Sequence, residues 1–178
     1  GGENTGAIVP ITFPHALYMA FQATFCIITA ALISGAIVER MRFSAYVVFI
    51  TLWALVVYSP VAHWVWGGGW RAKWGALDCP GGTLVHVNAA VAALAAVIAV
   101  GKRQGYGSST IVPHNVPFVL LGSGVLWFGW FGFNAGSALG ASPIPGLAFD
   151  TTILAPAGTL VVWTILDAVR TGKPTAVG

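Results

Sequence analysis

Five long apolar stretches, separated by short polar segments, dominate the chain. They cover about residues 14–38, 43–65, 82–100, 116–138 and 150–169, and the first two contain no charged residue. Crossing the hydrocarbon core of a bilayer takes about 20 mostly apolar residues. Stretches of this length satisfy their backbone hydrogen bonds in lipid as helices. The pattern therefore predicts five membrane-spanning helices, with Asp150 as the N-cap of the last one and Pro156 as a kink within it.

Composition agrees with this pattern and excludes a soluble domain. Of the 178 residues, 57% are hydrophobic and 7% are charged, against about 25% charged in ordinary soluble domains. The mean hydropathy is +0.82. The net charge of +3 comes from basic residues placed singly or in pairs, so no basic stripe indicates nucleic-acid binding. We expect an all-α integral membrane protein.

The basic residues between the apolar stretches predict the orientation in the cell membrane. By the positive-inside rule, the side richer in Lys and Arg faces the cytoplasm. One side has only Arg71 and Lys73, and the other has six basic residues: Arg40, Arg42, Lys102, Arg103, Arg170 and Lys173. We therefore expect residue 1 outside and residue 178 in the cytoplasm.

The loop after the second stretch is rich in tryptophan. Trp70 and Trp74 are typical of an aromatic belt at the membrane interface. Trp66 differs because residues 67–69 are all glycine, which lets the backbone turn tightly and approach other segments. We expect this indole to face an opening rather than lipid.

Two ionisable groups mark the third stretch. His86 lies inside it, eight residues after Asp78, which is about 12 Å along a helix axis. An ionisable group in a membrane is a functional-site hypothesis by default, although a neutral histidine bonded between packed helices has the same pattern. Asp78 fits a helix cap, a charge that attracts a cation, or both.

Aromatic residues follow one face of two other stretches. Phe21 and Phe25 are four residues apart, and Trp130, Phe133 and Ser137 share a face near a Gly132-x-x-x-Gly136 pattern that permits close helix packing. With His86, these residues describe a narrow apolar path, which favours a solute that binds as a cation and passes largely neutral.

An enzyme is disfavoured because no nucleophile, metal cluster or second ionisable group accompanies His86 at a usable spacing. No cofactor or metal is expected. The two cysteines, Cys26 in an apolar stretch and Cys79 in a loop, do not indicate a disulfide.

Several longer motifs carry a family resemblance over essentially the whole chain. "HWVWGGGW", "GALDCPGGTLVHVNAA", "GKRQGYG", "PHNVPFVLLG" and "GWFGFNAGSA" resemble the ammonium transporter / Rhesus protein family, closest to its microbial and plant ammonium transporters. The resemblance implies a fold of around eleven spans in two inverted halves. The present spans match the third to the seventh, so we expect residues 1–178 to be a partial transporter domain. The second pore histidine of the family belongs to a later helix.

The resemblance also implies roles for individual residues. Phe25, Trp66 and Ser137 match the external ammonium recruitment site, and Phe25 and Phe133 match the stacked gate phenylalanines. Phe21 and Trp130 match pore-lining positions, His86 matches the first pore histidine, and Asp78 matches a structural and electrostatic aspartate. Cys79-Pro80 departs from the family, which commonly has an aromatic residue and then alanine there.

Substrate and partners follow from the resemblance as well. It implies transport of ammonium or ammonia, with methylammonium as an analogue, by a homotrimer in the lipid bilayer. A cytoplasmic PII-type regulatory protein is a further expected partner. The alternative is an ammonium sensor with the same fold, coupled to a signalling domain outside this segment.

Overall fold

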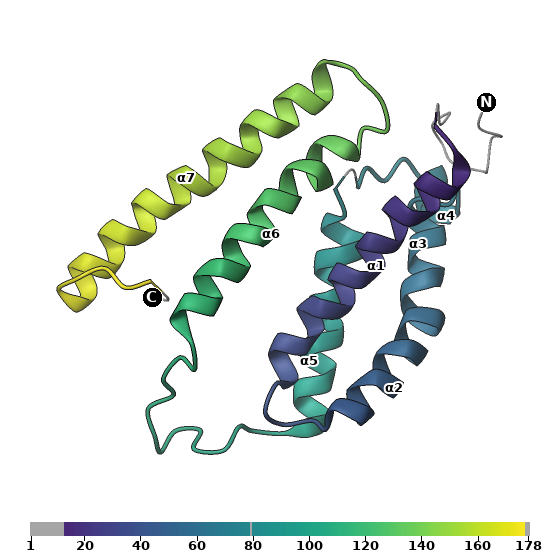
Figure 1. Ribbon diagram of the computed structural model, residues 1–178. Coiled ribbons are helices and arrows are strands. Elements are labelled where there is room, and N and C mark those ends of the chain that lie inside the picture. Colours follow the sequence, from purple (N-terminus) through teal and green to yellow (C-terminus); the bar gives the residue numbers. More distant parts are fainter. Residues whose placement is uncertain (1–12, 79, 177–178) are drawn as a thin grey trace. The chain divides into compact units, whose positions relative to one another are not determined.

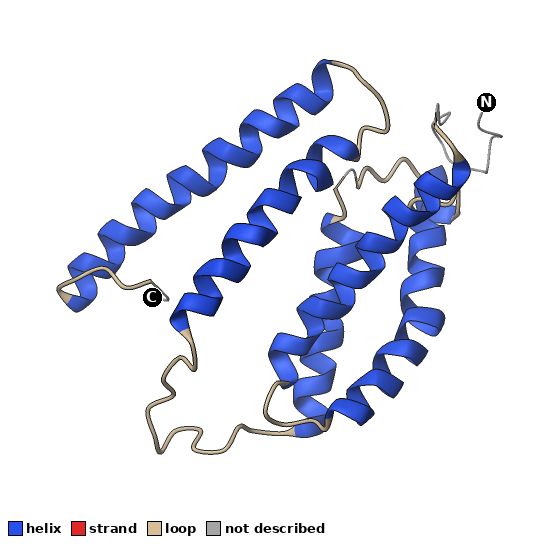
Figure 2. Ribbon diagram, viewed as in Figure 1, coloured by secondary structure: helices blue, strands red, loops and turns tan. Residues whose placement is uncertain are grey.

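The computed structural model describes residues 13–78 and 80–176, and in that part of the chain all regular structure is helical (Figure 2). The helices form two compact units, one ending at Ser109 and one beginning at Thr110. Each unit is described by itself.

The first unit is a group of packed helices (Figure 1). Its elements in chain order are α1 (His15–Ile37), α2 (Phe43–Trp53), the π-helix η1 (Ala54–Tyr58), α3 (Ser59–Val65), α4 (Trp70–Lys73), the π-helix η2 (Gly82–Val87) and α5 (Asn88–Val100). The elements α2, η1 and α3 follow one another directly, as do η2 and α5. The unit therefore has three long helical segments and one short helix.

One face of α1 forms the centre of this unit. Its buried residues are Phe25, Thr29, Ile33 and Ile37, and their spacing of four puts them on one side of a helix. This side packs against η2 and α5, which bury Leu84, Val85, Ala89 and Ala96 in return. In lipid such an interface is held by close van der Waals packing, and small residues such as alanine permit the close approach.

The second unit consists of α6 (Val116–Gly136) and α7 (Pro143–Thr171), which lie side by side. The side chain of Asn115 caps α6 by accepting a hydrogen bond from the Phe118 amide at 3.1 Å. Thr152 joins the two helices. Its carbonyl accepts from the Trp127 indole at 3.0 Å, and its hydroxyl oxygen accepts from the Asn134 amide at 2.9 Å.

The prediction of five membrane-spanning helices is confirmed, since five helical segments among the described residues are long and apolar enough to cross a bilayer. The first four observed segments differ by at most two residues from the predicted stretches, if α2 to α3 and η2 to α5 are each taken together. The prediction that Asp150 is an N-cap was wrong. Asp150 lies inside α7, whose N-cap is Ser142. The helix begins earlier than predicted because proline is well tolerated in the first turn of a helix. Beyond it, α7 continues as one helix through Pro156.

Candidate functional site

The turn after α3 fixes the position of Trp66. The Gly69 amide donates to the His63 carbonyl at 3.0 Å, which folds the chain back on the end of α3. A Cβ atom at Gly69 would lie 2.6 Å from Cα of Trp64, and one at Gly67 would lie 2.7 Å from Nδ1 of His63. Both glycines are thus needed for a close approach of backbone, as the glycine run predicted.

Trp66 belongs to a row of aromatic rings on one end of the first unit. Its ring lies edge-to-face against Phe25, with centroids 5.0 Å apart, and Phe25 makes the same kind of contact with Phe21, also at 5.0 Å. Phe25 is only 1% exposed, whereas Trp66 and Phe21 are half-buried. Aromatic pairs prefer this edge-to-face arrangement, so the buried Phe25 ring orients the half-buried Trp66 and Phe21 rings on either side of it.

Asp78 connects Trp66 to the start of η2. One carboxylate oxygen, Oδ2, accepts hydrogen bonds from the amides of Thr83 at 3.0 Å and Leu84 at 2.8 Å. Its backbone carbonyl accepts the indole N–H of Trp66 at 2.6 Å. The same residue therefore satisfies two free amides of a first helical turn and holds the indole ring in one orientation.

Gly81 completes this connection. It has φ +93°, and an added Cβ would lie 2.7 Å from Cγ2 of Val85 and 3.5 Å from Cη2 of Trp66. The conformation is left-handed, where a side chain is strained. A glycine here lets η2 begin directly beneath the indole.

His86 lies in η2, half-buried, on the segment that Asp78 caps. A π-helix is rare and short inside an α-helical segment, and such insertions are frequent at functional sites. The following helix α5 then continues with regular geometry from Asn88.

The remaining predicted residues lie in the second unit. Trp130 and Phe133 have ring centroids 5.4 Å apart on α6. Ser137, at the end of that helix, donates its hydroxyl proton to the Phe133 carbonyl at 2.6 Å. A hydroxyl that donates in this way keeps oxygen lone pairs with which to accept a hydrogen bond.

The predicted site residues thus form two sets. Phe21, Phe25, Trp66, Asp78 and His86 lie in the first unit, and Trp130, Phe133 and Ser137 lie in the second. Contact of Phe25 with Phe133 or Ser137 stays a prediction. Cys79 lies outside the described residues. The hydrogen bond from Trp66 to the Asp78 carbonyl was not predicted from the sequence, in which Gly81, a position of positive φ beside the indole, is a local signal of the close approach.

No metal site emerges from the described part of the chain, where no three His, Cys, Asp or Glu residues are grouped to hold an ion. The chemistry available is aromatic, with one hydroxyl, one imidazole and one capping carboxylate.

Comparison with known proteins places this arrangement in a family. The sequence profile of the Ammonium Transporter Family matches residues 5–178. An ammonium transporter of Aquifex aeolicus is 51% identical over 166 residues, covering 93% of this chain and 38% of that protein. Ammonium transporter Amt1 of Archaeoglobus fulgidus is 42% identical over 178 residues, covering 100% of this chain and 45% of that protein.

Solved structures agree. A crystal structure of a mutant of Candida albicans Mep2 has a TM-score of 0.84 and 40% identity, covering 94% of this chain and 38% of that chain. A "Sensor Amt Protein" has a TM-score of 0.83 and 33% identity, covering 99% of this chain and 49% of that chain. The chain therefore spans less than half the length of these relatives. With its five apolar helices and its match over residues 5–178, this multi-pass membrane chain belongs to the ammonium transporter family.

Proposed function

We propose that the protein containing this chain transports ammonium or ammonia across the cell membrane. The observation that carries the proposal is the edge-to-face pair of Phe25 and Trp66, whose indole is held by the Asp78 carbonyl. A cation is attracted to the face of an indole more strongly than to any other side-chain ring. Because the chain belongs to the ammonium transporter family, we take this cation to be ammonium.

The residues then have a defined order of action. Trp66 and Phe25, with the Ser137 hydroxyl oxygen, recruit ammonium at an outer site, where loss of water favours release of a proton. Neutral ammonia passes the aromatic residues that line the path, which are Phe21, Phe25, Trp130 and Phe133. The imidazole of His86 passes a hydrogen bond along this path, since one nitrogen of an uncharged imidazole ring donates and the other accepts.

The setting in the cell completes the proposal. Residues 39–42, 101–113 and 170–178 face the cytoplasm, because six of the eight basic residues lie there. The complete protein is a homotrimer. Mass measurement of the detergent-solubilised protein tests this oligomeric state, and a stable monomer would exclude it. A PII-type protein binds its cytoplasmic side, and methylammonium is carried as an analogue.

Flux into vesicles that contain the full-length protein tests the function. Wild-type protein should carry ammonium and methylammonium, while His86→Ala should change the flux or the charge moved per nitrogen and leave assembly intact. Trp74→Ala is the control, because this exposed ring at the end of α4 lies outside the proposed path. Absence of ammonium flux in the wild type, or wild-type flux and selectivity in His86→Ala, would contradict the proposal.

A sensor remains the second candidate, favoured by the similarity to the "Sensor Amt Protein". In that case the same aromatic site binds ammonium and reports it to a signalling domain. The full reading frame separates the two functions, since a signalling domain after the membrane segment favours sensing.

A further inference from the structure

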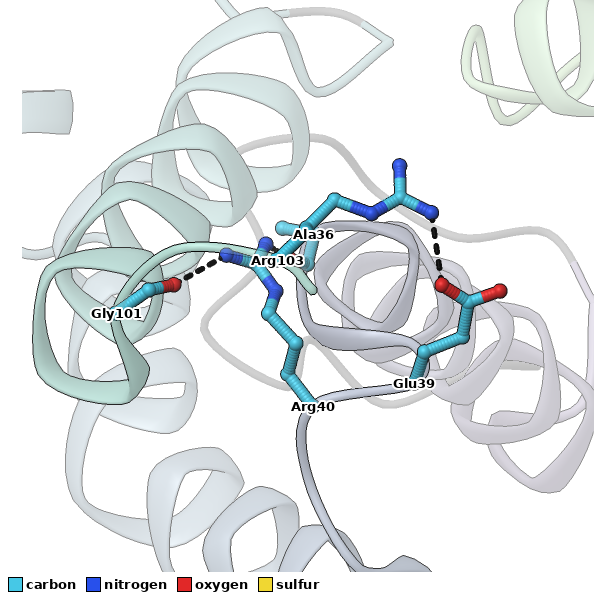
Figure 3. Close-up of polar contacts among 5 residues, drawn as sticks. All are labelled: Ala36, Glu39, Arg40, Gly101 and Arg103. Atoms are coloured by element: carbon cyan, nitrogen blue, oxygen red, sulfur yellow. Dashed lines mark hydrogen bonds and ion pairs between the residues drawn. The ribbon is translucent and has the colours of Figure 1, made fainter. Parts of the chain in front are cut away.

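A cluster of charged residues lies at the opposite end of the first unit from Trp66, where α1 and α5 both end. Figure 3 shows Arg40 reaching from the turn after α1 to the end of α5, and Arg103 reaching back to Glu39. Arg40 thus binds Gly101, and Arg103 binds Glu39, so two contacts connect the segments that follow α1 and α5. Arg40 and Arg103 were predicted only as markers of the cytoplasmic side.

The Arg40 guanidinium joins the ends of two helices. Its Nη1 donates to the carbonyl of Gly101 at 2.5 Å, just past the end of α5, and its Nη2 donates to the carbonyl of Ala36 in the last turn of α1. The last carbonyls of a helix lack partners within the helix and attract cations. One planar fork therefore satisfies the ends of two helices, one adjoining Arg40 in the chain and the other reached at Gly101, 61 residues after Arg40.

The second link is of a different kind. Arg103 pairs with Glu39 at 2.9 Å, but the Glu39 side chain is 68% exposed, and exposed ion pairs contribute little to stability. Arg40 is half-buried, and its Nε is buried without a hydrogen-bond partner in the described structure. A buried donor left without a partner is costly, so the contacts of the two Nη atoms must offset that cost for the side chain to stay in place.

The helix held by Arg40 is the one that continues from His86. Asp78 binds the first amides of this segment at one end, and Arg40 binds the carbonyl of Gly101 at the other. We propose that Arg40 is a positioning residue for His86, because it fixes the end of α5 against α1 and so sets where the imidazole lies. The inference rests on the proposed transport function, in which His86 acts on the passing solute.

The test uses full-length protein in vesicles with three variants. Arg40→Gln removes the cationic fork, Arg40→Lys keeps the charge with a single donor group, and Arg103→Gln is the matched control that removes only the exposed pair. Arg40→Gln should lower maximal ammonium flux about tenfold, since a displacement of about 1 Å at a working group costs up to about a hundredfold. The ammonium concentration at half-maximal flux should stay within about twofold, because the Trp66 site lies at the other end of the unit. Arg40→Lys should recover part of the flux.

Backbone hydrogen exchange of residues 82–101 gives a second measurement that does not need transport. Exchange should rise in Arg40→Gln and stay at the wild-type rate in Arg103→Gln. Wild-type flux and exchange in Arg40→Gln, or equal effects of the two glutamine variants, would overturn the inference. Should Arg40→Gln fail to assemble, Arg40→Lys decides: lowered maximal flux with unchanged half-saturation supports the inference, and wild-type flux overturns it. Failure of the transport function itself would appear as absent flux in the wild type, and the exchange measurement would then decide the role of Arg40.

Discussion

Replacing Asp78 tests whether its carboxylate works as a hydrogen-bond acceptor or as a charge. In Asp78→Ala the amides of Thr83 and Leu84 lose their acceptor. Loss of an N-cap acceptor costs about 0.5–2 kcal/mol, and loss of a negative charge at a helix start costs about 0.3–1 kcal/mol. Together these predict that Asp78→Ala lowers the free energy of unfolding by about 1–3 kcal/mol. Asp78→Asn keeps an acceptor oxygen and should lose only the charge contribution, about 0.3–1 kcal/mol.

Unfolding of the full-length protein in mixed micelles measures both variants, and ammonium flux is measured on the same samples. Asp150→Asn is the control, because it removes an exposed carboxylate that lies within α7 rather than at its start. Asp78→Ala should lower both stability and flux, because the start of η2 and the carbonyl that holds Trp66 move together. Equal losses of stability in the two Asp78 variants would refute the acceptor role and leave only the charge.

Three further predictions follow from the same end of the unit and from the loop charges. Trp66→Phe removes the indole face and its bond to Asp78, so the ammonium concentration at half-maximal flux should rise roughly two- to tenfold, from about 0.5–1.4 kcal/mol of lost cation attraction; an unchanged value would exclude a recruiting role. Gly81→Ala should lower the free energy of unfolding by at least about 1–2 kcal/mol through backbone strain. Gly75 also has a positive φ but open space around it, so the loss in Gly75→Ala measures strain alone, and any greater loss in Gly81→Ala measures the steric clash. In a protein whose Cys26 and Cys79 are replaced by serine, an impermeant maleimide added outside cells should label Lys73→Cys and miss Arg42→Cys, and the reverse pattern would contradict the orientation.

The number of helices was predictable because apolar length alone decides it. A stretch of about 20 apolar residues without charges has few alternatives in lipid. The start of α7 was not predictable in the same way. Pro143 and Pro145 lie among small and polar residues that indicate a loop, yet both lie in the first turn of the helix. Proline is accepted there because the amide it lacks has no partner in any case.

Ring contacts in the site were predictable from spacing only where the residues are neighbours along one helix. The contact between Phe21 and Phe25 follows from their spacing. The contact between Phe25 and Trp66 does not, since they lie on different elements, and only family resemblance suggested it. No property of the Ala54–Tyr58 or Gly82–Val87 sequences distinguishes a π-helix from an ordinary one, because helix propensity does not encode the extra residue in a turn.

The π-helix at Gly82–Val87 bears on how this segment tolerates insertion and deletion over evolutionary time. Each residue of an α-helix advances the side chains by about 100°, and a π-turn accommodates one residue more than an α-turn. Losing one residue between Gly82 and Val85 would let the segment relax to a regular helix while α5 kept its packing on α1. Because the shortened turn covers nearly the same rotation with one residue fewer, His86 would keep its direction relative to α5, and the Asp78 carboxylate would accept from the amides that then open the helix. A lineage that lost that residue would keep both the packing of α5 and the placement of the imidazole, so a length difference at this point is no sign that His86 has changed its role.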